Sequence, residues 1–263
     1  MYVDSHCHLS YPGLADRIDA VRADMAAADV DRALCICTTL EEFEAVHALA
    51  LAYDNFWCSV GVHPDNEDVQ EPTVDDLVSR AARPRVVAIG ETGLDYYRLD
   101  GRGVDEMAWQ RERFRVHIRA SLATGLPLVI HTRSASADTL DVLREEGGSR
   151  ATGVFHCFTE TAEVARAALD LGFYISFSGI LTFKNAAELR EVARFVPLDR
   201  CLIETDSPYL APVPFRGKPN SPAWVPYVAR QIAELKGSSP EAIGETTSRN
   251  FETLFGRVAA NAG

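Results

Sequence analysis

The sequence predicts an α/β protein, and within that class a (β/α)8 TIM barrel. Short apolar runs alternate with segments of helical periodicity along the whole chain, and strict alternation of this kind indicates a parallel sheet. Eight such units fit within 263 residues, which is an ordinary length for a closed barrel. A doubly wound open sheet is the alternative. We expect a single domain over residues 1–263, because no linker, repeat or low-complexity segment interrupts the pattern.

The expected strands are short and mostly apolar. They are Tyr2–Ser5, Arg32–Cys37, Phe56–Val60, Val86–Gly90, Leu128–Ile130, Thr152–Phe155, Tyr174–Phe177 and Cys201–Ile203. Apolar residues at helical spacing follow each strand. The expected helices are Ala15–Ala28, Leu40–Tyr53, Val74–Ala82, Ala108–Thr124, Ser136–Glu146, Ala162–Leu171, Ala186–Phe195, Ala223–Lys236 and Pro240–Phe255. Two long loops are expected, Thr92–Gly103 and the proline-rich Pro208–Pro222.

Composition limits the possible functions. The formal net charge is −12, which argues against a wide basic face that coats nucleic acid. A phosphate polyanion would therefore have to bind in a local pocket with the help of metal ions. The six cysteines form no CxxC pair, and we expect buried free thiols in a reducing compartment. The chain has neither a signal pattern nor an apolar run of about 18 residues, so we expect a soluble cytoplasmic protein.

Histidines and carboxylates gather at the expected carboxyl ends of the strands. His6 and His8 are two residues apart, so their side chains should face the same side of a strand, with Asp4 one step below them. Side chains of metal-ligand type also follow later strands: His63, Glu91, His131, His156 and Asp206. The carboxyl ends of barrel strands form one rim, where active sites lie. Each residue alone could be an ordinary rim residue, but together they predict a metal site.

The chemistry of these ligands indicates a site for two ions. Imidazole and carboxylate groups suit Zn, Mn, Fe or Mg-like ions. Four histidines with two carboxylates are too many for one tetrahedral ion, and they suit two ions that share a bridging carboxylate. Such a pair lowers the pKa of a shared water and holds the oxygens of a phosphoryl or acyl centre. The last carboxylate, Asp206, could bind one ion and also accept the proton of the water.

Six sequence blocks occur in a specific order along the chain. They are Asp4–His8, Gly61–Pro64, Ile89–Tyr96, Ile130–Arg133, His156–Phe158 and Leu202–Tyr209. They resemble the TatD family of metal-dependent deoxyribonucleases, which belongs to the amidohydrolase-like metallohydrolases. The resemblance runs from residue 2 to about residue 255.

The resemblance implies a role for each matched residue. It implies that a first ion takes His6, His8, Glu91 and Asp206, and that a second takes the bridging Glu91 with His131 and His156. It further implies that His63 lies beside the pair and contacts a substrate phosphate. The implied activity is exonuclease-like trimming of single-stranded DNA ends.

Other polar residues near the rim are candidates for supporting roles. Glu204 and Asp4 could orient the ligands or accept ordinary hydrogen bonds. Cations on rim loops could bind phosphate oxygens or be solvated surface charges: Arg98, Arg133, Arg216 and Lys218. Aromatic residues there could stack on a base or pack the loops: Tyr96, Tyr97, Tyr209 and Trp224. His47 and His117 lie inside helical patterns and are expected to be ordinary.

The sequence therefore predicts a hydrolase of phosphodiester bonds that uses two divalent ions per chain, Zn, Mg or Mn. Asp206 and Glu91 are the expected catalytic carboxylates, and single-stranded DNA ends are the expected substrate. Three alternatives stay open. They are a hydrolase of the same fold that acts on an ester, amide or lactone (including an aminoacyl–RNA ester), a phosphatase, and a metal-binding protein without activity.

Overall fold

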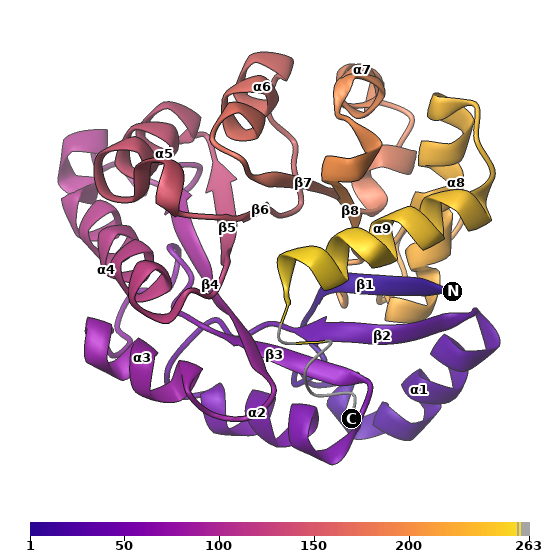
Figure 1. Ribbon diagram of the computed structural model, residues 1–263, viewed down its shortest axis with the longest axis horizontal. Coiled ribbons are helices and arrows are strands. Elements are labelled where there is room, and N and C mark those ends of the chain that lie inside the picture. The colour runs from indigo at the N-terminus through magenta and orange to yellow at the C-terminus, as the bar shows by residue number, and fades with distance from the viewer. Residues whose placement is uncertain (257, 259–263) are drawn as a thin grey trace.

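The protein is a closed barrel of eight parallel strands. In the computed structural model, which describes residues 1–256 and 258, the strands form one sheet in the order β1 to β8 (Figure 1). They are β1 (Tyr2–Cys7), β2 (Val30–Cys35), β3 (Phe56–Val60), β4 (Val86–Asp95), β5 (Leu128–Arg133), β6 (Gly153–Phe155), β7 (Tyr174–Phe177) and β8 (Cys201–Ile203). The end of β8 joins β1, because the amide of Asp206 donates to the carbonyl of His6 at 2.9 Å. The barrel is confirmed, and the open sheet is excluded.

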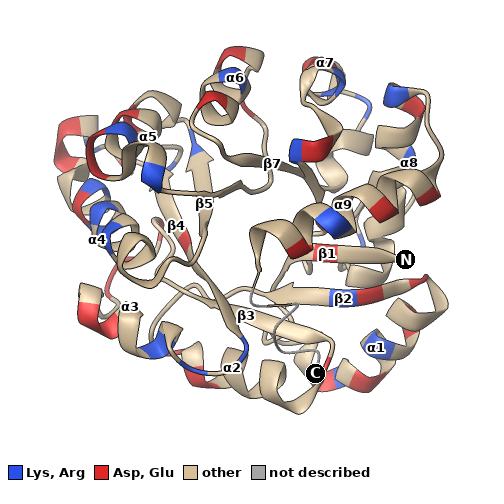
Figure 2. Cartoon of the chain, viewed as in Figure 1, with Lys and Arg blue, Asp and Glu red and all other residues tan. Residues whose placement is uncertain are grey.

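The helices surround the sheet on its outer face (Figure 1). They are α1 (Ile18–Ala27), α2 (Phe43–Ala52), α3 (Val74–Ala81), α4 (Ala108–Thr124), α5 (Ser136–Val142), α6 (Ala162–Asp170), α7 (Ala187–Phe195), α8 (Val225–Lys236) and α9 (Pro240–Leu254). Basic and acidic residues are interspersed along these helices (Figure 2). Within the part of the chain that the structure describes, no helix has the length and apolarity that crossing a membrane requires.

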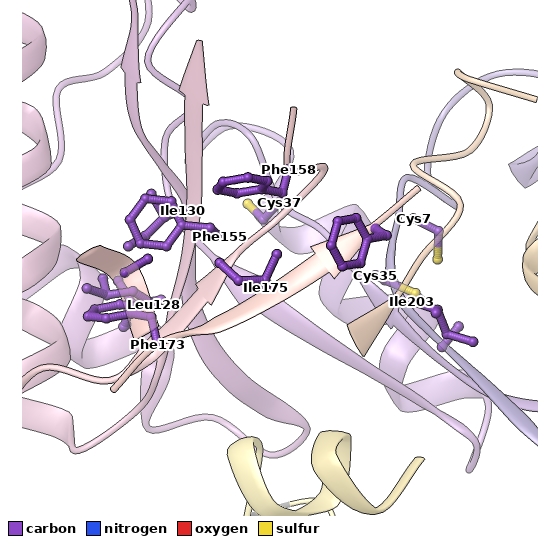
Figure 3. Packing of buried hydrophobic residues seen from close by; sticks show 14 of the residues in the cluster. Cys7, Cys35, Cys37, Leu128, Ile130, Phe155, Phe158, Phe173, Ile175 and Ile203 are labelled. Carbon is purple, nitrogen blue, oxygen red and sulfur yellow. The ribbon is translucent and has the colours of Figure 1, made fainter. Parts of the chain in front are cut away.

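Two apolar layers hold the barrel together. The larger lies between the strands and the helices, and Figure 3 shows part of it, where the rings of Phe155 and Phe173 meet edge to face at 5.6 Å. The smaller fills the barrel below the site, where Trp57 and Val129 pack with Phe251 of α9. This burial supplies most of the folding free energy. The stable half of the barrel thus lies under the strand ends that carry the site.

The structure corrects several element boundaries. The expected loop from Thr92 was wrong, because β4 continues to Asp95 and pairs with β5 as far as Arg133. The α-helix expected to reach Glu146 ends at Val142, and the chain continues as a π-helix over Leu143–Gly147. Glycine, threonine and aspartate are typical of loops, and only the pairing with β5 keeps the end of β4 extended.

Gly93 shows why this extension of β4 depends on glycine. Its φ is +132°, and a Cβ placed on it would lie 1.9 Å from the carbonyl oxygen of His131. A side chain here would therefore separate β4 from β5 at the level of the site.

We expect Gly93→Ala to lower the free energy of unfolding by at least about 3 kcal/mol, because backbone strain and a steric clash add up. Gly101→Ala is the matched control. Gly101 also has a positive φ, +86°, but a Cβ there meets nothing within 4 Å, so we expect a loss of about 1 kcal/mol. Urea unfolding of both variants measures the difference, and equal losses would contradict the clash.

Candidate metal centre

The strand ends bring the predicted ligands to one place. His6 lies in β1, Glu91 in β4 and His131 in β5, while His8, His156 and Asp206 follow their strands within a few residues. These side chains lie at the floor of a pocket of about 700 Å³ at the rim. His6 is completely buried beneath it. Side chains from five strands therefore converge on one buried volume, as the sequence pattern predicts.

Glu91 occupies the middle of this group. Its Oε1 lies 2.8 Å from His156 Nε2 and 3.3 Å from His131 Nδ1. Its Oε2 lies 3.3 Å from His6 Nε2 and 4.0 Å from His8 Nε2. The two oxygens of this carboxylate thus face different ring nitrogens, His131 and His156 on one side and His6 and His8 on the other.

Ring nitrogens also lie close to one another. His6 Nε2 and His8 Nε2 are 3.3 Å apart, and both are within 3.5 Å of Asp206 Oδ1. His131 Nδ1 and His156 Nε2 are 3.4 Å apart. Nitrogens that share a small space with carboxylate oxygens form the kind of donor set that a divalent ion satisfies. The triads His6, His8 and Glu91, or His6, His156 and Asp206, could each hold an ion.

The electrostatics of the centre suit a cation. Burial alone would raise the pKa of Glu91, but His156, His63 and His6 outweigh burial and hold that pKa well below its ordinary value. Burial also lowers the pKa of His6, which favours the neutral ring that a metal requires. The ionised Glu91 and the neutral His6 thus have the protonation states of metal ligands. Burial would lower the pKa of His8, His131 and His156 too, but neighbouring carboxylates outweigh it and raise the pKa, so a metal ion would displace protons from these rings.

Two carboxylates orient the ligand histidines. Glu204 Oε1 lies 3.2 Å from His156 Nδ1, and Asp95 Oδ2 lies 3.0 Å from His131 Nε2. A neutral ring that donates to such a carboxylate keeps its other nitrogen free of a proton. In both rings that other nitrogen faces Glu91.

Asp95 was missing from the predicted site. The sequence pattern predicts a loop at this position, whereas Asp95 ends β4 with its side chain almost fully buried. Glu91, Gly93 and Asp95 alternate along an extended strand and so share a face. That alternation would have indicated Asp95 if the segment had been predicted as a strand.

Asp4 does not lie one step below the histidines on their face. The register of β1 against β2 shifts between Asp4 and Cys7, which interrupts the alternation. The Asp4 carboxylate instead accepts hydrogen bonds from the amide of Thr205 at 2.9 Å and from its hydroxyl. Burial raises the pKa of Asp4 to about 8. Asp4 therefore ties β1 to the segment that carries Asp206.

His63 presents a proton rather than a lone pair. Its Nδ1 accepts a hydrogen bond from the amide of Asp65 at 3.0 Å. Because an accepting nitrogen carries no proton, the neutral ring is protonated at Nε2, which lies 3.3 Å from Glu91 Oε1. Distance alone groups His63 with Glu91 and His131 as possible ligands, but the tautomer makes it a hydrogen-bond donor.

The other predicted substrate-binding residues separate into two places. Arg98 and Arg133 line the pocket of the metal centre. Lys218 does not, because it lines a neighbouring groove together with Arg216. Tyr96 is nearly buried, so it is not available to stack on a base.

His117 is a supporting residue that the sequence analysis treated as ordinary. Its Nε2 accepts from the amide of Val62 at 2.9 Å, and its Nδ1 donates to the carbonyl of Arg113 at 2.8 Å. Arg113 in turn donates to the carbonyl of His63 at 2.9 Å. Helix α4 thus holds the end of β3 that carries His63. A histidine inside a helical pattern gives no local signal of this role.

Folding should become less favourable in acid because of His117. Burial lowers its pKa from 6.5 to about 4, so the unfolded chain binds a proton that the folded chain excludes. This difference weakens folding as the pH falls from about 6.5 to about 4, by at most about 3 kcal/mol. We expect His117→Gln to be destabilised near neutral pH but to lose less further stability in acid than the unsubstituted protein. Urea unfolding at about pH 7.5 and about pH 5 measures how much the free energy of unfolding of each protein falls with pH. Equal losses for the variant and the unsubstituted protein would contradict this role of His117.

Comparison with known proteins agrees with this geometry. Residues 3–256 match the family model described as TatD related DNase. The chain is 51% identical over 257 residues to the uncharacterized metal-dependent hydrolase YcfH of Escherichia coli (strain K12), covering 96% of this chain and 95% of that protein. It is 36% identical over 247 residues to the 3'-5' ssDNA/RNA exonuclease TatD of Citrobacter koseri, covering 92% and 93%.

A solved structure shows the same architecture. The TatD homologue YjjV of Escherichia coli K12 superposes with a TM-score of 0.87 at 27% identity, covering 97% of this chain and 98% of that one. The sequence resemblance is therefore confirmed. This chain belongs to the TatD-related DNase family of metal-dependent hydrolases.

Proposed function

We propose that the protein is a two-metal phosphodiesterase that removes nucleotides from the ends of single-stranded DNA. The observation that carries this proposal is the position of Glu91, whose two oxygens face different pairs of ring nitrogens. A carboxylate in this position suits two ions better than one. The name of the Citrobacter koseri relative, a ssDNA/RNA exonuclease, supports the class of substrate.

The residues present fit such a pair of ions. His6, His8 and Asp206 with Glu91 Oε2 would hold one ion, and His131 and His156 with Glu91 Oε1 would hold the other. The donors are a mixture of nitrogen and oxygen, which Zn, Mn or Mg can use. When bound, the ions would supply an activated water at neutral pH and neutralise the charge of the phosphate oxygens.

The side chains of the chain itself supply proton transfer and orientation. Asp206 is part-exposed at the pocket, with its side chain 14% accessible, so it can accept a proton from an attacking water. As the water oxygen bonds to phosphorus and the bond to the leaving oxygen breaks, Asp206 can return that proton to the leaving oxygen. Asp4 keeps Asp206 in position through Thr205.

The pocket also offers donors for the phosphate. His63 Nε2–H points toward Glu91 and would donate to a phosphate oxygen. The Arg133 guanidinium lies 3.6 Å from the centroid of the Tyr97 ring, which keeps it at the mouth of the pocket. Both groups favour a phosphodiester over a neutral ester.

We expect Asp206→Asn to reduce kcat on a single-stranded oligonucleotide by at least about 100-fold, because the asparagine amide cannot accept the proton. The fold should remain, since Asn is nearly isosteric with Asp. The assay adds back Mg, Mn or Zn to stripped protein, and circular dichroism is the control for folding. Near-normal turnover by the variant would refute the assigned role. If the unsubstituted protein cleaves an ester or an amide but not DNA, the proposal that DNA is the substrate is refuted.

Metal content provides an independent test. We expect two ions per chain in the reconstituted protein, by elemental analysis after gel filtration. His131→Asn combined with His156→Asn should leave one ion, because of the two Glu91 oxygens these rings contact Oε1, while His6 and His8 stay beside Oε2. His47→Asn is the control and should keep both ions, because His47 lies in α2 and its ring contacts the carbonyl of Pro84. One ion in the unsubstituted protein, or two in the double variant, would contradict the assignment.

A further inference from the structure

A groove of about 1410 Å³ lies beside the metal centre. Its lining comes from α1 and α8, which lie on the same side of the barrel (Figure 1), and from the loop that follows β8, between Pro208 and Ser221. Tyr209 and Leu210 line both this groove and the pocket of the metal centre. The two cavities therefore adjoin at Tyr209 and Leu210, and a strand that passes over Tyr209 can lie in both.

The groove carries positive charge that no carboxylate neutralises. Four cations line it, and all are exposed: Arg17, Arg216, Lys218 and Arg230. None of them forms an ion pair within 4.0 Å with another residue in the described ranges 1–256 and 258. Asp24 is the one acidic residue of the lining. In a chain of net charge −12, such a local excess of free cations suits a polyanion.

Aromatic rings orient two of these cations, Arg216 and Arg230. The Arg216 guanidinium lies 3.7 Å from the centroid of Phe183, and that of Arg230 lies 4.7 Å from the centroid of Tyr227. A ring face orients a guanidinium without neutralising it, and leaves its N–H groups free for phosphate oxygens. The cations are thus oriented before a ligand arrives.

The groove also exposes surfaces on which bases can stack. Tyr209, at the junction with the metal centre, has 54% of its surface exposed. Trp224 is half-buried in the groove wall and stacks on Phe215 at 4.1 Å. Unpaired bases stack on such rings, whereas the bases of a duplex are already stacked on one another.

We propose that this groove binds the part of a single nucleic-acid strand that lies outside the metal centre. Tyr209 stacks on the base nearest the metal centre, and Arg216 and Arg230 bind phosphates farther along the strand. This inference rests on the proposed function, since it extends the same substrate. The combination of exposed rings with unpaired cations favours a nucleic-acid strand over an acidic peptide, which has no bases to stack.

Binding and cleavage together test the groove. Binding of a labelled strand of about twelve nucleotides is measured by fluorescence anisotropy in the Asp206→Asn protein, in which cleavage is slowed at least about 100-fold. We expect Arg216→Gln with Arg230→Gln to raise Kd at least about tenfold. The slope of the logarithm of the association constant against the logarithm of the salt concentration should become less steep by about 1.4, which is about 0.7 for each lost phosphate contact. Tyr209→Ala should raise Kd about tenfold, and Tyr209→Phe should restore it.

The chain offers a matched control outside the groove. Arg166 and Arg200 are also exposed, and each lies over a ring, of Phe195 at 4.6 Å and of Tyr174 at 5.1 Å. Arg166→Gln with Arg200→Gln removes the same charge, and we expect Kd to change by less than about twofold and the salt slope to stay the same. Equal effects of the two double variants would overturn the proposal. A polyglutamate that competes as well as the strand, or a duplex that binds as tightly, would also overturn it.

Cleavage separates this inference from the proposed function. We expect the groove double variant, with Asp206 intact, to lower the ratio of kcat/KM for the long strand to that for a dinucleotide, because a dinucleotide does not reach the groove. If the protein cleaves DNA but this ratio does not change, the proposed role of the groove is refuted and the proposed function stands. If the strand binds through the groove but no metal-dependent cleavage occurs, the proposed function is refuted and the role of the groove stands.

Discussion

Glu91 is the group on which the rest of the centre depends. A carboxylate that is 2% exposed is expensive to bury as an anion, and only the surrounding imidazoles lower its pKa enough to keep it charged. Its position in turn requires that β1, β5 and β6 end at the same level as β4. The arrangement of the strand ends therefore also determines the charge state of the centre.

Much of the molecule serves to hold these few side chains. Asp95 and Glu204 orient two of the rings, and Asp4 ties the first strand to the last. Helix α4 holds the His63 loop from outside the barrel through Arg113 and His117. Geometry of this kind lowers the cost of organising a site when substrate binds. The opposite end of the barrel, packed around Phe251, carries stability instead.

Charged residues on the surface differ between the groove beside the metal centre and the rest of the protein. The chain as a whole is acidic, and many of its arginines are paired with carboxylates, as Arg102 is with Glu67 at 2.6 Å. In the groove between α1 and α8, Arg216 and Arg230 lie over aromatic rings instead. An acidic protein can therefore present a local excess of positive charge beside its metal centre.

The sequence by itself determined the barrel and which residues meet in the candidate metal centre. Alternation of short apolar runs with helical segments is a local property, so it can be read without knowing any contact. The histidines and carboxylates stood out because barrel topology sends every strand end to one rim. Five of the seven histidines belong to this group, which left few other candidates.

Tertiary structure alone decided the rest. β4 reaches Asp95 only because β5 pairs with it, and Asp4 leaves the ligand face because the register of β1 shifts. The role of His117 and the separation of Lys218 from the metal pocket depend on distances between segments far apart in the chain. Local propensity carries no record of such distances, since packing between distant segments sets them.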